Sequence, residues 1–213
     1  MHRIKTLTVL VGLSIACAKP NPQAPATAPA PEHALSGLAA QHVAVLPTYR
    51  VRVDSALGWS VGRPTELQRT LDADILAAFE ERGLRRAWLF PEDLAASYRR
   101  NPTYGTDPFA LAEEPLRAPN LAVDQRLPEP LASQIRTLVA LQQDVRLVLA
   151  PVEVRVERAQ PSGGRGVLRV VLLDARLSNV RWIGDVESDR MSSFGPALSA
   201  SIANRLAGVV SPR

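Results

Sequence analysis

The alternation of apolar and polar positions changes character several times along the chain, and each change marks an expected element. Residues 43–46 form a continuous apolar run, typical of a buried strand, and residues 49–53 then alternate as an exposed extension does. After a glycine-containing loop, Pro64 suits the first turn of a helix, which ends near Gly83. The apolar residues at helical spacing that predict its inner face are Leu67, Leu71, Ile75, Ala78 and Phe79.

Three more helices and four more strands are expected further along. Pro91, Pro130 and Pro196 each stand where a helix begins, because proline is tolerated in a first turn. Pro151 marks a bulge or an edge within the longest expected strand, 145–158. We expect Trp182 to be buried against the last helix, which begins at Pro196. The expected strands are 86–90, 145–158, 167–174 and 180–186.

This order, β-α-β-α-α-β-β-β-α, predicts an α/β domain with a five-stranded mixed sheet. A strand-helix-strand opening implies a parallel pair of strands. Three consecutive strands near the end imply antiparallel neighbours.

The amino terminus has the pattern of an export signal. Residues 1–16 combine a short basic start with an apolar run that is too short to span a membrane but suits a signal-peptide core. The run ends at Cys17, the only cysteine, in a stretch that resembles a lipobox, although Ser14 stands where leucine is usual. We expect lipid on Cys17. The alternative is an ordinary secretory signal cleaved near Ala16 or Ala18.

A lipid on Cys17 would anchor the protein in the cell envelope. The three acyl chains usual for bacterial lipoproteins exceed the two signals that stable anchoring needs. Ala18 follows the cysteine, whereas aspartate there resembles an inner-membrane retention signal, so we expect the outer membrane, with the domain facing the periplasm. Residues 17–35 are rich in proline and alanine and predict a flexible tether, which leaves one globular domain at 36–213.

Within this domain, the excursion at residues 101–130 contains six prolines, with one helical turn expected near 109–113. A loop of that length inside a compact domain is usually functional or flexible. Tyrosine and arginine carry much of the energy of protein interfaces. The alternative is that the prolines pin an insertion to the sheet for stability alone. The candidate partner-binding residues are Tyr98, Arg99, Arg100, Tyr104 and Phe109.

Three local stretches resemble a group of bacterial envelope proteins. They are residues 42–47, the helix end at 78–83, and the hairpin from 170–174 to 180–184, in which an apolar strand ends in Asp174 and the next carries Trp182. The group comprises the amino-terminal domain of TolB, the curli-secretion lipoprotein CsgG and the activator lipoprotein LpoB. The resemblance implies a three-layer α/β/α sandwich, similar to the anticodon-binding-domain fold. Residues 176–179 fill the hairpin turn without the glycine usual in those families.

The sequence does not support catalysis. Residues 58–62 match the Gly-x-Ser-x-Gly pattern of a hydrolase elbow, but no histidine follows Ser60. The only lysine of the mature chain, Lys19, lies beside the anchor, which excludes a Ser-Lys mechanism. No histidine-cysteine cluster or phosphate-binding glycine loop is present. We therefore expect no enzyme activity, no cofactor and no metal, and the near-balanced charge of an exported chain argues against nucleic acid.

Two groups of carboxylates are interpreted as solvated side chains. Asp185, Glu187 and Asp189 would share one face of a strand end, but they lack the glycine and distal glutamate of a calcium loop. Asp72 and Asp74 lie on the expected outer side of the first long helix.

Taken together, these features favour a non-enzymatic lipoprotein. Its domain would bind or scaffold another envelope protein or the cell wall, while the lipid on Cys17 holds it at the membrane. The alternative is a lipoprotein subunit of an export or transport complex, in which homo-oligomerisation is the working state.

Overall fold

The computed structural model describes residues 30–59, 63–159 and 162–212. The strands are β1 (Val43–Val45), β2 (Arg50–Val53), β3 (Trp88–Leu89), β4 (Leu147–Arg158), β5 (Gly164–Asp174) and β6 (Asn179–Glu187). The α-helices are α1 (Pro64–Glu80), α2 (Pro91–Arg100), α3 (Leu131–Ala140) and α4 (Pro196–Val210). Short 3-10 turns lie at Ser36–Leu38, Ser55–Leu57, Leu84–Arg86 and Glu114–Arg117.

These strands form one mixed sheet, in the order β3-β1-β4-β5-β6. β1 pairs in parallel with β3 and β4, whereas β4, β5 and β6 pair antiparallel, as the element order predicts. β2 adds a short strand to this path, because it pairs in parallel with the second half of β4. The alternating run expected to be an exposed extension is therefore part of the sheet.

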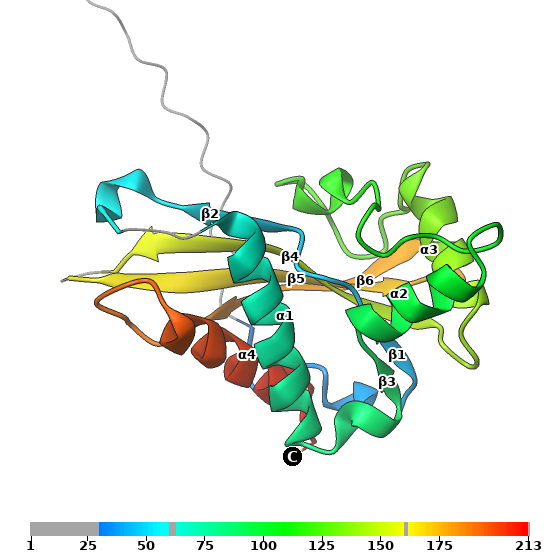
Figure 1. The fold of residues 1–213 in the computed structure, drawn as a ribbon, viewed down its shortest axis with the longest axis horizontal. Helices are drawn as coiled ribbons and strands as arrows, with labels where there is room; N and C mark the ends of the chain where they lie inside the picture. Colours follow the sequence, from blue (N-terminus) through cyan, green and yellow to red (C-terminus); the bar gives the residue numbers. More distant parts are fainter. Residues whose placement is uncertain (1–29, 60–62, 160–161, 213) are drawn as a thin grey trace, which may run out of the picture.

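Helices and the excursion cover the two faces of the sheet and make a three-layer α/β/α domain. On one face, α1 and α4 pack against each other and against apolar side chains of the sheet, such as Val45 and Leu168. On the other face, α2, α3 and the excursion pack on side chains such as Ala44 and Val171. Figure 1 shows α1 crossing in front of the strands and α4 below them, with α2, α3 and the excursion gathered at the right.

A bulge in β4 decides which side chains face which layer. The register of the β4–β5 pairing shifts between Pro151 and Glu153, which confirms the irregularity predicted at this proline. Before the shift, Ala150 belongs to the cluster under α2 and α3, and after it Val154 belongs to the cluster under α1 and α4. An extra residue in a strand turns the side chains that follow it to the other face. Beyond the bulge, the charged residues of β4 therefore lie on the α2 and α3 side.

Several local expectations need correction. The strand expected at 86–90 is only Trp88–Leu89, because Leu84–Arg86 form a 3-10 turn. The helical turn of the excursion is Glu114–Arg117 rather than 109–113. Trp182 is half-buried, since β6 ends the strand order and its indole lies over Gly184, which has no side chain. It does pack against the cluster that contains Ile202, as expected.

Asp72 is not a fully solvated helix residue. It is half-buried, and its Oδ1 accepts a hydrogen bond from the Thr48 amide at 2.9 Å and one from the Thr48 hydroxyl at 2.7 Å. Burial raises the pKa of Asp72 to about 6, although both hydrogen bonds from Thr48 act to lower it. The carboxylate thus ties α1 to the segment between β1 and β2 at a cost in desolvation.

This pKa predicts a pH dependence of stability. Because the folded-state pKa lies above the ordinary value, the protonated form favours folding, and this contribution is lost as the pH rises from about 4 to about 6. Asp72→Asn keeps an acceptor for Thr48 without the charge, so it should raise the free energy of unfolding at pH 7.5 by about 1–2 kcal/mol. Urea denaturation from pH 4 to 8 checks this. A variant less stable than wild type at pH 7.5 would contradict the assignment.

Candidate protein-binding site

The excursion is fixed to the sheet by buried apolar side chains and by backbone hydrogen bonds. Leu111, Leu116 and Leu127 are buried in the cluster under α2 and α3. The Leu127 amide donates to the Ser178 carbonyl and the Asp124 amide to the Val180 carbonyl, both at 2.8 Å. The excursion therefore forms part of the third layer, together with α2 and α3.

Tyr49 links the excursion to β2. Its hydroxyl donates to the Pro108 carbonyl at 3.1 Å. Burial, together with the nearby carboxylates of Glu113, Asp72 and Asp107, raises the pKa of Tyr49 well above its ordinary value. The phenol stays protonated and remains a donor at physiological pH, so this contact holds the excursion beside the sheet.

Other side chains of the excursion point to solvent. Among the described residues, the large apolar side chains that are strongly exposed are Tyr104 at 75%, Phe109 at 57%, Val123 at 54% and Leu177 at 52%. The first three belong to the excursion, and Leu177 lies in the β5–β6 turn that Leu127 contacts through Ser178. Exposed apolar side chains gathered at one end of a domain are typical of an interaction surface.

Of the residues predicted for binding, four are exposed and one is half-buried. Arg99 and Arg100 are exposed at the end of α2, and Tyr104 and Phe109 are exposed on the excursion. Tyr98 is half-buried, and its ring lies so close to Gly105 that a side chain there would crowd it. The structure brings all of them to the α2 and excursion end of the domain.

Sequence reasoning missed Val123 and Leu177. Both are ordinary aliphatic residues in irregular segments, and only the fold shows that the β5–β6 turn lies beside the excursion. Ser178 in this turn has a positive φ of 52°, a left-handed backbone conformation that glycine adopts most readily.

A second surface, the charged face, lies on the same side of the sheet next to the excursion. Cross-strand pairing puts Arg50, Glu153, Arg169 and Asp185 in one row of alternating charge across β2, β4, β5 and β6. Glu153, Arg169 and Asp185 are buried at 7%, 8% and 4% exposure. The charged face also includes Arg52, Arg155, Glu157, Arg165 and Glu187.

Ion pairs connect much of this face. Arg155 Nη2 donates to Asp185 Oδ2 at 2.9 Å, and Arg165 Nη1 donates to Glu187 Oε2 at 2.6 Å. Asp185 is therefore buried in an ion pair rather than solvated, which corrects the sequence interpretation. The alternation of charged and apolar residues in β2 and in the second half of β4 is a sequence signal that could have revealed this face.

Arg169 is a buried charge of this face that has no described carboxylate in ion-pair contact. Its guanidinium lies within 4 Å of no carboxylate among the described residues, and its Nη2 donates to the Ala118 carbonyl of the excursion at 3.3 Å. Burial lowers the pKa of Arg169, as does the nearby Arg155, whereas Asp185 and Glu153 raise it. The side chain thus joins the charged face to the excursion.

The described part of the chain contains no group of three or more histidine, cysteine, aspartate or glutamate residues able to hold a metal ion. None of its helices is long and apolar enough to cross a membrane.

Some residues singled out from the sequence lie outside the described part of the chain. They are Ser60, the signal segment 1–16, and residues 17–29 of the tether, which include Cys17. The last part of the tether segment packs on the domain, where the Ala30 amide donates to the backbone carbonyl of Asp185 and the Leu35 amide to that of Val209.

Comparison with known proteins gives a distant likeness to a solved structure. No protein family matches the chain, and no curated protein matches it. Among solved structures, the chain is similar to PelC from Paraburkholderia phytofirmans, described as a PelC dodecamer. The two share 12% identity over 85% of this chain and 94% of PelC, with a TM-score of 0.41. At this score the likeness carries no argument about function.

Proposed function

We propose that this protein is a non-enzymatic, lipid-anchored protein of the cell envelope whose α/β domain binds another envelope protein. One observation carries the proposal. In the described part of the chain, the strongly exposed large apolar side chains all lie on the excursion or in the turn beside it. Their neighbours on the same excursion are buried and hydrogen-bonded, so the segment is held in place before any partner binds.

A pre-ordered loop loses little entropy when it binds, and aromatic side chains give a large contact area for each rotamer that is fixed. Tyr104 and Phe109 meet both conditions, with Arg99 and Arg100 nearby along the chain as charged donors. The lipid predicted on Cys17 would keep the domain near its partner at the membrane.

Tyr104→Ala combined with Phe109→Ala tests the binding role. We expect the double variant to lose about 30-fold or more of partner capture after crosslinking in the native envelope, as loss of interface hot spots does. Its melting temperature should stay close to that of wild type, because both side chains are exposed.

The matched control is Leu111→Ala, which removes a buried side chain of the same excursion. It should lower stability while leaving capture by the folded protein intact. Arg99→Ala with Arg100→Ala should weaken capture without lowering stability. Unchanged capture in both surface variants would show that the excursion serves only stability. Capture of a second copy alone would instead support the homo-oligomeric alternative.

Metabolic labelling with an acyl-chain probe tests the anchor. We expect label on wild type and none on Cys17→Ser, because the thiol of Cys17 is the predicted attachment point. Label that persists on Cys17→Ser would remove the lipoprotein part of the proposal.

A further inference from the structure

The strand β2 has an edge that no described strand pairs with. Its partner is β4, and the Asp54 amide, just after β2, donates to the Val156 carbonyl at 2.9 Å. In a parallel ladder, alternate residues turn both backbone groups to the same neighbour. Arg50 and Arg52 therefore bond to β4, while the N–H and C=O groups of Val51 and Val53 point to the opposite edge. No described residue forms a hydrogen bond with these four groups.

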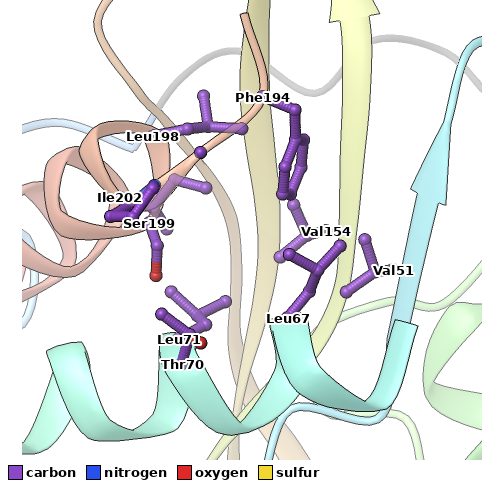
Figure 2. A pocket seen from close by; sticks show the side chains of 11 residues that line it. Val51, Leu67, Thr70, Leu71, Val154, Phe194, Leu198, Ser199 and Ile202 are labelled. Atoms are coloured by element: carbon purple, nitrogen blue, oxygen red, sulfur yellow. The ribbon is translucent and has the colours of Figure 1, made fainter. Parts of the chain in front are cut away.

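An apolar groove opens on one face beside this edge. It has a volume of about 100 Å³ and lies between β2, β4, α1 and the start of α4. Figure 2 shows the side chains of Val51, Leu67 and Phe194 around it. An apolar cavity of about 150 Å³ can hold benzene, so this groove has room for one small aliphatic side chain.

Ser199 gives the groove one polar group. Its hydroxyl is buried and has no hydrogen-bond partner among the described residues. In Figure 2 the hydroxyl points towards Thr70 and Leu71 across the groove. A buried polar group without a partner costs free energy, and a ligand that reaches it can recover part of that cost.

The opposite face of the same edge is basic. The side chains of Arg50 and Arg52 are 52% and 62% exposed. Both reach Glu153 Oε1, at 3.7 and 3.8 Å, so one buried carboxylate serves two guanidinium groups. These distances exceed the roughly 2.7–2.9 Å of a charge-assisted hydrogen bond. The two guanidinium groups therefore keep donors available for further carboxylates.

We propose that β2 is a docking edge for an extended segment of a partner protein in which two acidic residues flank one small aliphatic residue. The backbone of the segment would bond to Val51 and Val53. Its acidic side chains would lie on the face of Arg50 and Arg52, and its aliphatic side chain on the face of the groove, because alternate residues of a strand face opposite sides. Two copies of β2 cannot pair well edge to edge, since they would set arginine against arginine.

This inference deepens the proposed function, on which it rests, and it assigns a second contact surface distinct from the excursion.

A peptide-binding experiment tests the β2 edge. The probe is a fluorescent peptide containing Glu-Leu-Glu in an otherwise neutral extended sequence, titrated against the detergent-solubilised full chain. Lys-Leu-Lys and Glu-Asp-Glu peptides of the same length are the references. We expect the Glu-Leu-Glu peptide to bind about tenfold more tightly than either reference at physiological ionic strength.

Two variants separate edge pairing from general attraction of charge. Val53→Pro removes an outward N–H without touching the ladder to β4, a position that edge strands tolerate, and it should weaken binding about tenfold. Arg50→Glu with Arg52→Glu should reverse the preference towards the Lys-Leu-Lys peptide. The matched control, Arg86→Glu with Arg190→Glu, changes two exposed arginines elsewhere and should leave the affinity unchanged.

Equal binding by wild type and Val53→Pro, or equal loss in the Arg86 and Arg190 control, would overturn the proposal. A dimer of wild type that Val53→Pro converts to a monomer would also overturn it, because the occupant would then be a second copy. If the peptide fails to bind while Tyr104→Ala with Phe109→Ala still abolishes partner capture, the proposed function stands and only the β2 edge is removed.

Discussion

Replacing Phe79 by alanine should cost about 3–5 kcal/mol of the free energy of unfolding. Its side chain is fully buried, and its ring centroid lies 5.1 Å from that of Trp88 and 5.8 Å from that of Phe90, both edge-on. These contacts join α1 to β3 and to the start of α2. Because small domains are stable by only about 5–15 kcal/mol, the variant should lose much of its stability in urea denaturation.

Trp182→Ala is the natural comparison. The sequence predicts that Trp182 is buried, but it is half-buried on β6, at the end of the strand order. Its loss should therefore cost clearly less than that of Phe79. If Trp182→Ala proves the more damaging change, or if Phe79→Ala melts within a degree or two of wild type, the described core is wrong.

Replacing Asp174 by alanine should cost about 2–4 kcal/mol. The carboxylate is 1% exposed and ends β5. Its Oδ2 accepts bonds from Arg146 Nε at 2.9 Å and Nη2 at 2.6 Å, and its Oδ1 accepts the amides of Arg176 and Leu177 at 3.0 Å. Alanine would leave the β5–β6 turn without these bonds, so the excursion that pairs with this turn should loosen as well.

Asp174→Asn is the control, because it keeps the acceptor for the two amides, and it should cost about half as much. Burial alone would raise the pKa of Asp174, but the bonds from Arg146, Leu177 and Arg176 outweigh it, and the pKa is lowered. The stabilisation is therefore present above the ordinary carboxyl pKa and is lost as the pH falls below about 4. Wild type should lose stability in that range by more than Asp174→Asn. Parallel curves for the two would contradict this role.

Local patterns predicted much of the fold. The inner face of α1 is confirmed, because helical spacing of apolar residues reports directly on burial. The mixed sheet follows from the element order in the same way. Pairing of β2 was not predictable, since it depends on the bulge at Pro151 and Glu153, which lies about 100 residues further along the chain. The exposure of Trp182 likewise depends on the position of β6 in the strand order.

The candidate site was only partly accessible from the sequence. Aromatic and arginine residues near a proline-rich segment indicated the excursion, but burial separates Leu111 from its exposed neighbour Phe109, and no local pattern shows that difference. The charged face needs four strands to come together. In the sequence, its residues resemble ordinary surface residues. Only the β5–β6 register shows that Arg169 lies beside Asp185.

The binding role of the excursion is tested most directly by photo-crosslinking from single positions in the native envelope. A photoreactive phenylalanine analogue would replace Tyr104, then Phe109, and, as a control, Arg69, which is exposed on α1. The proposal predicts the same discrete crosslinked product from positions 104 and 109 and none from position 69. Crosslinking from position 69 but from neither excursion position, or identical products from all three, would contradict it.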